Sequence, residues 1–513
     1  MDANYFIGVD IGTTSTKAIV FSAQGEVKGT GNNGYSLLVP QPAWAEQDPD
    51  VIFAAMIAAI RSAVDQSGVA KSQIAAVSFS GAMHSVIAIA PSGQPLTNAI
   101  IWADNRSIAQ VERLKQDGSG HALYLRTGTP IHPMSPLPKL MWLREVSPDV
   151  FQNAARFISI KEYVFYRLFD RFVVDYSIAS ATGLLNLATL QWDEGAIATA
   201  GIRPDQLSDL VPTTSVLRGM KSEYAEAMGL DPNTPMVVGA TDGVLANLGV
   251  GAIAPHQIAI TIGTSSAVRS VVPKPLTDEK GRTFCYALTE DRWVIGGPSN
   301  NGGILLRWMR DTFCQPEVEQ AKPQGIDPYD LMIDAALQIP AGAEGLICLP
   351  FFSGERAPYW NPEARGVFFG VALHHTKAHF TRAVMESILF AVYSISLALR
   401  DLAGTAQEIR ASGGFARSQP WQQMMSDIFG YDVLIPEVYE SSAFGAAVLG
   451  MYAVGAIAQL DDVETFIRIG DRHTPNLDLS KTYQHLFSIY ERIYYNTQSE
   501  FKALAEFQRA KRD

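Results

Sequence analysis

The sequence predicts an α/β protein made of two related domains, and three observations support this fold class. The chain has 513 residues, a length typical of about two to four domains. Short apolar runs alternate with longer segments of helical periodicity, which is the pattern of α/β proteins. A motif also recurs half a chain apart, because residues 8–15 (GVDIGTTS) resemble residues 259–266 (AITIGTSS). We therefore expect a duplicated architecture in which each domain presents a polar turn between two strands.

The N-terminal part can be divided into elements in chain order. Tyr5 to Asp10 is an apolar run that predicts a buried strand, and Lys17 to Ser22 predicts a second strand after a tight polar turn. Gln24-Gly25 predicts the hairpin turn that follows. A helix is expected from Pro49 to Val64, where apolar residues recur every four positions. Ile74 to Ser80 predicts another buried strand.

Glycine and proline indicate a boundary in the middle of the chain. Gly249, Gly251 and Pro255 cluster between an apolar helical segment and the second copy of the repeat. We predict one domain at residues 1–252 and another at 253–513, with a helical tail from about residue 460. The apolar stretch from Ala383 to Leu399 contains Glu386, and it is shorter than the roughly 20 apolar residues that span a bilayer. A core helix fits this stretch better.

Composition excludes several classes of function. The formal net charge is −12, whereas a general nucleic-acid binder needs a clustered basic surface. The N-terminus lacks the basic region and cleavage site of a signal peptide. The three cysteines form no CxxC pair, which indicates free thiols rather than disulfides or a thiolate metal site. We expect a cytoplasmic protein with no membrane or nucleic-acid partner.

The first copy of the repeat carries chemistry suited to phosphate. Gly12 lets backbone approach a ligand, and Thr13 and Thr14 add hydroxyls to backbone N–H groups on one turn. Asp10 at a buried strand end needs a compensating cation or hydrogen bonds, and a Mg²⁺ ion held through water would supply one. The alternative is a threonine-rich hairpin in which Asp10 bonds to the turn. The sequence contains no GxxxxGK[ST] P-loop and no protein-kinase HRD/DFG set.

Asp242 admits two interpretations. It follows the apolar run Pro235 to Val238 and is flanked by Gly239 and Gly243. An aspartate in this position could project into a cleft and take a proton from a hydroxyl nucleophile. It could equally cap the following helix, and from the local sequence alone the cap is the favoured interpretation.

Two further segments have weaker signals. Gly413 and Gly414 follow a strand-like run and precede a helix from Trp421 to Phe429, so a flat adenine ring could lie on bare backbone there. The segments SGAMH (80–84) and WADNR (102–106) both follow strand-like runs and could reach one pocket. Against this, His84 could be a core histidine, and Asp104 and Arg106 could form an ion pair.

Together these motifs resemble the FGGY carbohydrate kinases, and the resemblance covers nearly the whole chain. Residues 366–386 (GVFFGVALHHTKAHFTRAVME) are similar to the C-terminal signature of that family. Residues 134–145 (MSPLPKLMWLRE) resemble its N-terminal signature, with Val146 departing from the polar residue that the family prefers. Residues 440–447 (ESSAFGAA) resemble its last nucleotide-side motif. The resemblance implies an actin-like (ribonuclease H-like) fold of two domains flanking a cleft.

The resemblance also implies roles for residues at matching positions. Asp242 corresponds to the catalytic base, which reverses the capping preference, and Asp10 to the magnesium-associated aspartate. It implies ATP and Mg²⁺ as cofactors. Ser418 stands where many members have asparagine. The implied nucleotide and phosphate residues are Gly12, Thr13, Thr14, Lys17, Gly263, Thr264, Ser265, Gly303, Arg307, Gly413, Gly414 and Ser418.

The substrate loops resemble those of bacterial gluconokinases, a group within the family. Glycerol kinases have an Arg-Glu pair where Ala82-Met83-His84 stands, and xylulokinases have a more similar Gly-Gln-Met-His segment. The resemblance implies ATP-dependent phosphorylation of D-gluconate. A carboxylate needs cationic or N–H donors, which we expect from His84, His132, Arg106 and Lys139. The implied sugar-binding residues are Ala82, Met83, His84, Asp104, Arg106, His132, Met134 and Asp242.

Two alternatives remain open at this point. Xylulokinase or another polyol kinase of the same family would use the same fold. An actin-like ATPase that acts as a regulator or chaperone belongs to a different class and would need an added peptide-binding or helix-turn-helix domain, neither of which the sequence indicates. The expected partners are ATP and a small sugar acid, and a homodimer is compatible with the sequence.

Overall fold

The computed structural model describes residues 4–437 and 440–510, in which the chain forms two compact units. The N-terminal unit contains residues 1–254, 271–295 and 438–468. The C-terminal unit contains residues 255–270, 296–437 and 469–513. A single boundary at 252/253 would assign residues 271–295 and 440–468 to the second domain, whereas these two segments belong to the first unit.

The N-terminal unit is built on a six-stranded sheet with the strand order β13-β14-β5-β1-β2-β3. β1 (Tyr5–Ile11) pairs antiparallel with β2 (Ser15–Ser22), and β2 pairs antiparallel with β3 (Val27–Gly34). β5 (Ile74–Gly81) lies parallel to β1, and β14 (Met236–Thr241) lies parallel to β5. The carboxyl ends of β1, β5 and β14 therefore meet at one edge of the sheet, where ligands bind in open α/β sheets.

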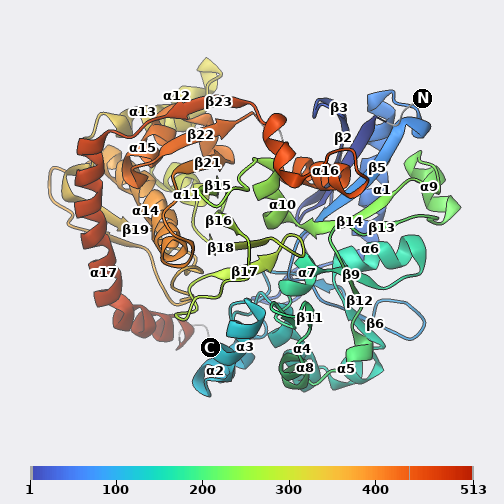
Figure 1. Cartoon of the computed structure of the whole chain (residues 1–513). Coiled ribbons are helices and arrows are strands. Elements are labelled where there is room, and N and C mark those ends of the chain that lie inside the picture. Colours follow the sequence, from blue (N-terminus) through green and yellow to red (C-terminus); the bar gives the residue numbers. More distant parts are fainter. Residues whose placement is uncertain (1–3, 438–439, 511–513) are drawn as a thin grey trace. The chain divides into compact units, whose positions relative to one another are not determined.

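A helix covers each face of this sheet (Figure 1). α1 (Pro49–Ser67) begins at the N-cap Asp48, has Pro49 in its first turn and ends at Gly68 with a left-handed conformation. α16 (Ser441–Ala453) packs on the opposite face so closely that a Cβ atom on Gly8 would lie 1.9 Å from the carbonyl oxygen of Ala443. Glycine is required at that position. Buried aliphatic side chains fill the space on both faces.

A helical region between β5 and β14 has its own apolar core. α4 (Pro136–Val146) is its central helix, and Leu137, Leu140 and Leu143 pack there with residues of α8 (Glu194–Ala200). This region contains residues 102–106 and residues 129–134, which include the predicted sugar-binding residues Asp104, Arg106, His132 and Met134. It thus places those loops beside the edge of the sheet where β5 ends.

The second sheet repeats the strand pattern of the first. The second sheet has the order β17-β18-β16-β15-β21-β22-β23. β15 (Gln257–Ile262) pairs antiparallel with β16 (Ser266–Val272) and parallel with β21 (Glu408–Ser412), which in turn is parallel to β22 (Asp432–Pro436). The order β18-β16-β15-β21-β22 thus corresponds to β3-β2-β1-β5-β14. The predicted duplicated, actin-like architecture is confirmed.

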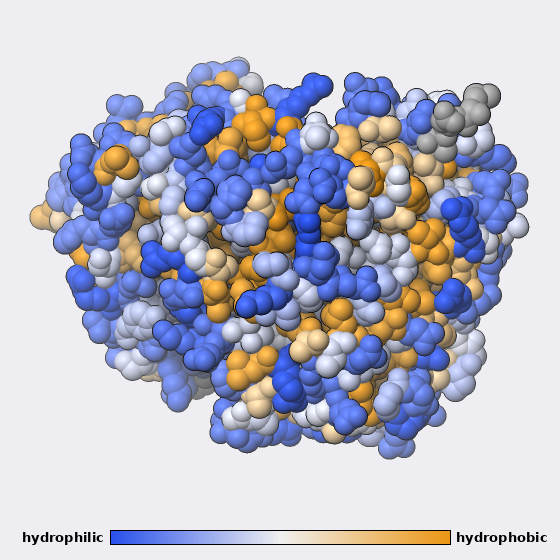
Figure 2. Space-filling view, in the orientation of Figure 1, coloured by the Kyte–Doolittle hydropathy of each residue, from blue (hydrophilic) through white to orange (hydrophobic). Residues whose placement is uncertain are grey.

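Two long helices complete the C-terminal unit. α14 (Lys377–Ala403) is apolar and long enough to cross a membrane, but 83% of its most apolar 18-residue window is buried in the structure. The predicted core helix at residues 383–399 is therefore confirmed. The tail predicted from residue 460 is not purely helical, because β23 (Ile469–His473) adds a strand to the sheet before α17 (Leu477–Ala510). On the face shown in Figure 2, hydrophilic residues are interspersed with smaller apolar patches.

Further helices and strands lie between the elements described above. In the N-terminal part they are β4 (Glu46–Gln47), η1 (Lys71–Gln73), β6 (Ile87–Ile89), β7 (Ala99–Ile100), α2 (Ile108–Gln116), α3 (Ser119–Thr127), α5 (Pro148–Asn153), β8 (Arg156–Ile158), α6 (Ile160–Phe169), β9 (Val173–Asp175), α7 (Tyr176–Ser180), β10 (Leu185–Asn186), β11 (Gln191–Trp192), η2 (Pro204–Gln206), β12 (Asp209–Val211), β13 (Val216–Leu217), α9 (Ser222–Met228) and α10 (Asp242–Gly249). Further along they are β17 (Phe284–Ala287), β18 (Trp293–Ser299), α11 (Gly303–Phe313), α12 (Gln315–Gln324), α13 (Pro328–Leu337), η3 (Ala343–Gly345), β19 (Ile347–Leu349), β20 (Val367–Phe369), η4 (Gly414–Arg417), α15 (Gln419–Phe429) and η5 (Leu460–Thr465).

Candidate active site

Two carboxylates lie at the common edge of the first sheet. Asp10 is near the end of β1, and its Oδ1 accepts a hydrogen bond of 2.7 Å from the hydroxyl of Ser80 at the end of β5. Burial, and after it the negative charge of Asp242, raise the pKa of Asp10 to about 6. The two aspartates are thus close enough to repel each other, which is an arrangement that a bound cation relieves.

Asp242 is the first residue of α10, immediately after β14. The N-cap residue of that helix is Thr241, so the prediction that Asp242 is the cap is wrong by one position. The Asp242 Oδ1 atom accepts a hydrogen bond of 2.6 Å from the N–H of Gly243. This contact fixes the carboxylate at the edge of the sheet without making it the helix cap.

The turn between β1 and β2 is held from the sheet and from the substrate loops. The hydroxyl of Tyr35 donates a bond of 2.5 Å to the carbonyl of Gly12, and Gln47 Nε2 donates one of 2.5 Å to the carbonyl of Thr13. Trp102 Nε1 donates a bond of 2.9 Å to the hydroxyl of Thr13. Thr14 is exposed at the tip of the turn. The geometry leaves the tip in contact with solvent, where a phosphate oxygen can reach it.

Lys17 and Glu440 form an ion pair beside this turn. The distance from Lys17 Nζ to Glu440 Oε1 is 2.6 Å, and both side chains are about one-third exposed. Lys17 also lowers the pKa of Asp10, as a secondary effect after burial and Asp242. The predicted phosphate residue Lys17 therefore lies next to Asp10, with its charge shared with Glu440.

The predicted sugar-binding segments converge on one small cavity in the N-terminal unit. Its walls include Thr13, Ala82, Met83 and Trp102, and its volume is about 10 Å³. That volume admits roughly one water molecule, so this cavity is smaller than a six-carbon sugar. The expected convergence of the two loops on a common pocket nevertheless agrees with the structure.

The charged residues of these loops are bound to other protein groups. Arg106 pairs with Asp104 at 2.8 Å and with Glu46 at 2.6 Å, and its guanidinium lies 3.7 Å from the centre of the Trp44 ring. The ion-pair interpretation of Asp104 and Arg106 is therefore confirmed. The side chain of Arg106 is only 3% exposed, so it presents little surface to a ligand in this conformation.

The two histidines also have partners. His84 has a positive φ of 72° and is buried, and its Nδ1 lies 2.7 Å from the carbonyl oxygen of Ala181. His132 Nδ1 accepts a hydrogen bond of 3.1 Å from the N–H of Met134, and the Met134 side chain is buried. His132 is partly exposed, so of these two rings it is the more accessible to a ligand.

Lys139 requires a correction. We expected its ammonium group to be a donor for the substrate carboxylate, but its side chain is fully buried in α4. Its Nζ atom donates to backbone carbonyl oxygens, including those of His84 at 2.7 Å and Met134 at 2.8 Å. Lys139 therefore binds the backbone of the loops and does not offer its ammonium group to a ligand.

The C-terminal unit contains the second polar turn, between β15 and β16. Gly263 N donates to the carbonyl of Ser265 at 2.9 Å, and Gly303 N donates to the carbonyl of Gly263 at 2.7 Å. The N-terminus of α11 is thus bonded to this turn, and Ile304 N donates to the carbonyl of Thr264 at 3.2 Å. A helix N-terminus beside a polar turn favours anionic ligands. Arg307 is exposed one turn further along α11.

Gly413 and Gly414 lie next to this turn because β21 is parallel to β15. Gly413 has a φ of 96°, and an added Cβ atom would lie 2.5 Å from the carbonyl oxygen of Ile262. Gly414 has no protein atom within 4 Å of the corresponding position. The structure therefore presents exposed bare backbone at Gly414, and Ser418 follows at the N-cap of α15.

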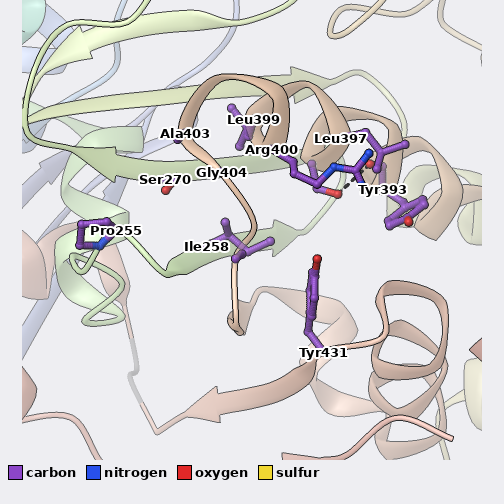
Figure 3. A pocket seen from close by; sticks show the side chains of 12 residues that line it. Pro255, Ile258, Ser270, Tyr393, Leu397, Leu399, Arg400, Ala403, Gly404 and Tyr431 are labelled. Carbon is purple, nitrogen blue, oxygen red and sulfur yellow. Dashed lines mark hydrogen bonds between the residues drawn. The ribbon is translucent and has the colours of Figure 1, made fainter. Parts of the chain in front are cut away.

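Another pocket in the C-terminal unit lies away from these residues. It is lined by Pro255 and Ile258 at the start of β15, together with Tyr393, Arg400 and Tyr431 (Figure 3). The polar turn is at the opposite end of β15. The pocket shown in Figure 3 has a cavity volume of about 20 Å³, which admits roughly one or two water molecules. A nucleotide therefore does not fit in this cavity.

Several residues of the site carried no usable signal in the sequence. Gln47 and Tyr35 are ordinary polar residues whose partners lie at least 23 positions away in the chain. Ser80 belongs to the segment 80–84 singled out in the sequence, but its contact with Asp10 crosses 70 positions. Trp102 belongs to a segment that we had singled out, but its contact with Thr13 crosses 89 positions. Within the described residues, no group of three or more His, Cys, Asp or Glu side chains is arranged to hold a metal ion.

Comparisons with known proteins agree with this arrangement. Residues 5–249 match the sequence model of the N-terminal domain of the FGGY family of carbohydrate kinases, and residues 258–454 match that of its C-terminal domain. Gluconokinase from Bacillus licheniformis is 50% identical over 508 residues, which cover 99% of both chains. Crystal structures of a gluconate kinase and of a ligand-bound xylulose kinase, both from Lactobacillus acidophilus, each superpose with a TM-score of 0.92 at 35% identity. Each alignment covers 98% of this chain and 99% of the other.

Proposed function

Because the chain belongs to the FGGY family of carbohydrate kinases, we propose that it transfers the γ-phosphoryl group of ATP to D-gluconate, giving ADP and 6-phospho-D-gluconate. The observation that carries this proposal is the 50% identity to a gluconokinase along 99% of both chains. Xylulokinase activity is the alternative within the family, and the xylulose kinase from Bacillus subtilis is less similar, at 29% identity over 507 residues.

Asp242 is the proposed general base. Its carboxylate takes the proton from the 6-hydroxyl of the sugar acid as that oxygen attacks the γ-phosphorus. Three features support this role: its position at the edge of the sheet, its proximity to Asp10, and the fact that the N-cap of α10 is another residue. A positioned base contributes roughly 10²–10⁴-fold to such reactions.

Asp10 is the proposed site of Mg²⁺, held through water. The residues fit a hydrated cation, because the negative charges of Asp242 and, more weakly, Glu440 act on a buried Asp10; burial is the main cause of the raised pKa of Asp10 and the charge of Asp242 is the second. When bound with ATP, the ion would neutralise charge on the phosphate oxygens. The repulsion between Asp10 and Asp242 would be reduced at the same time.

The two polar turns are the proposed phosphate contacts. Thr13 and Thr14 present hydroxyl and N–H groups in the N-terminal unit, and the Gly263–Ser265 turn does so beside the N-terminus of α11. Backbone and hydroxyl donors of this kind stabilise charge that develops on a transferred phosphoryl group. Gly413, Gly414 and Ser418 are the proposed adenosine contacts, and Gly303 and Arg307 are further nucleotide contacts.

A coupled assay of ADP release tests the proposal. The purified protein is assayed with MgATP alone and with gluconate, xylulose, ribulose or glycerol added singly. Gluconate should give the highest kcat/KM, and ADP release without sugar should be slow. Fast release in every tube, independent of the sugar, would contradict a kinase and support the ATPase-regulator alternative. A cytoplasmic location and a homodimer remain predictions.

A further inference from the structure

Lys139 is the centre of a buried hydrogen-bond cluster in the N-terminal unit. Its side chain is completely inaccessible to solvent, and Nζ donates to four backbone carbonyl oxygens. The distances are 2.7 Å to His84, 2.8 Å to Ile101, 2.8 Å to Met134 and 3.3 Å to Ile100. An ammonium group has three N–H bonds, so all of them are used and one is shared.

These carbonyls belong to three separate loops of the candidate sugar site. His84 follows β5, and the neighbouring Met83 lines the small cavity. Ile101 lines the same cavity directly and precedes Trp102, which holds the hydroxyl of Thr13. Met134 is the residue whose N–H is bonded to the ring of His132. One side chain therefore joins loops that lie 55, 38 and 5 positions away from it in the sequence.

We propose that Lys139 is a positioning residue that fixes these three loops in the geometry that binds the sugar acid. The inference rests on the proposed function for the identity of the sugar. It assigns no contact between Lys139 and the substrate. Instead, the Lys139 ammonium group acts through the backbone at His84, Ile101 and Met134.

Lys139 joins all three loops at one point, in addition to the pairwise hydrogen bonds of Val86 with Ile100 and of Ser107 with Pro133. Loops are ordinarily the most mobile parts of a fold, and a buried charged donor makes stronger hydrogen bonds than a neutral one. A lysine buried at this depth is costly unless its protons are accepted, and here the acceptors are backbone atoms of the loops themselves. Loss of the ammonium group therefore removes a charged donor from each of these carbonyls, although those of Ile100 and Ile101 keep the N–H groups of Val86 and Asp104. It also removes a group that joins all three loops.

The protonation of Lys139 is sensitive to pH in the neutral range. Burial lowers the pKa of Lys139 to about 7, while the charge of Asp104 raises it and that of Arg106 lowers it. The other titratable or charged groups around it are Glu46, which pairs with Arg106, and the rings of His84 and His132. Above pH 7 the neutral amine has only two N–H bonds for four carbonyls, so the loops lose a support as pH rises.

The test is steady-state kinetics of the full-length Lys139→Met variant with MgATP and gluconate. Methionine is similar in length and apolar, so it fills the space and removes the donors. We expect the KM for gluconate to rise by at least about tenfold, with the KM for ATP within about twofold of wild type. The matched control is Leu143→Ala, on the same helix and buried in the same core, which should lower thermal stability and leave the KM for gluconate unchanged.

A purely structural role for Lys139 predicts a different pattern. It would lower the amount of active enzyme, and hence kcat, with both KM values unchanged in Lys139→Met and Leu143→Ala alike. That result overturns the proposal. If Lys139→Met fails to fold, the pH profile of the wild type decides: we expect the KM for gluconate to rise between pH 7 and pH 9 while the KM for ATP does not, and a flat profile overturns the proposal.

The outcome can be separated from a failure of the proposed function. If the wild type phosphorylates another sugar and not gluconate, the gluconokinase proposal fails. The same KM comparison is then made with the sugar that is turned over. A rise in the KM for that sugar in Lys139→Met supports the positioning role, and an unchanged KM contradicts it.

Discussion

Lys161 and Asp175 form a buried ion pair that contacts the end of β14, the strand that precedes the proposed catalytic base Asp242. Lys161 Nζ lies 2.7 Å from Asp175 Oδ2 and donates a hydrogen bond of 3.1 Å to the carbonyl of Ala240, two residues before Asp242. Asp175 also caps α7 through a bond of 2.9 Å to Ile178 N. From that helix, Ser177 accepts a bond of 3.2 Å from the N–H of Thr241. The end of β14, and with it Asp242, is thus held from two sides.

The first prediction concerns this ion pair. Lys161→Met leaves the carboxylate of Asp175 buried without its charged partner, which should reduce the free energy of unfolding by about 3–5 kcal/mol. Adding Asp175→Asn should restore part of this loss, by roughly 0.5–3 kcal/mol. Urea unfolding at pH 7 measures both effects. A double variant that is destabilised by the sum of the two single effects would show that the pair is not coupled.

The second prediction concerns the proposed base. Asp242→Asn should lower kcat by roughly 10²–10⁴-fold and leave nucleotide affinity close to that of wild type, because the amide cannot accept the proton. Rapid-quench or coupled kinetics and a nucleotide titration measure the two quantities. Asp205→Asn, on the surface in an ion pair with Arg203, is the control and should have wild-type kcat. Near-normal turnover in folded Asp242→Asn would return this residue to a structural role.

The third prediction follows from the raised pKa of Asp10. The pKa of about 6 in the folded protein lies above the ordinary aspartate pKa of 3.8, so the folded state binds more protons than the unfolded state between about pH 4 and pH 6. Stability therefore falls as pH rises through that window. Asp10→Asn removes this cost and should be more stable than wild type at pH 7.5 by roughly 1–3 kcal/mol, although inactive.

Denaturant unfolding at two pH values checks this difference. The stabilisation of Asp10→Asn should be present at pH 7.5 and should shrink at pH 4, where Asp10 of the wild type is protonated. Asp231→Asn, in an exposed turn, is the control and should not differ from wild type in this way. A variant that is less stable than wild type at pH 7.5 would show that the ionised Asp10 is stabilising and that the repulsion argument is wrong.

The fourth prediction compares two neighbouring glycines. Gly413→Ala introduces a side chain at a φ of 96° and 2.5 Å from the carbonyl oxygen of Ile262, so it should lower the melting temperature measurably. Gly414→Ala has open space around the new methyl group and should fold normally. If adenosine lies on this backbone, Gly414→Ala should raise the KM for ATP several-fold while the KM for gluconate is unchanged. Equal KM values for ATP in wild type and Gly414→Ala would remove Gly414 from the nucleotide site.

Local pattern predicted most of the elements that form the edge of the first sheet. The expected strands at Tyr5–Asp10 and Ile74–Ser80 correspond to β1 and β5, and the expected helix from Pro49 corresponds to α1. The turn at Gln24-Gly25 is present, with Gly25 N bonded to the carbonyl of Ser22 at 2.9 Å. These features succeed because apolar periodicity, proline and glycine act over a few residues.

Long-range contacts decide the features that local pattern missed. In the sequence Lys139 is a cation that could bind a ligand. The structure shows that its ammonium protons are accepted by the carbonyls of His84 and Ile101, which lie 55 and 38 positions away. The ion pair of Arg106 with Asp104 was foreseen as an alternative because it spans two residues, whereas the pairing with Glu46 spans 60. Residues 440–468 belong to the first unit, in which α16 packs closely against Gly8 of β1, and no local signal in that segment indicates this contact.

The most direct test of the central claim is a competition between two sugars for one enzyme. Equimolar gluconate and xylulose are incubated with limiting MgATP, and the two phosphorylated products are quantified, since their initial ratio equals the ratio of the two kcat/KM values. We predict that 6-phosphogluconate forms in at least about tenfold excess, which corresponds to about 1.4 kcal/mol of transition-state discrimination. An excess of xylulose phosphate would contradict the gluconokinase assignment while leaving the family intact.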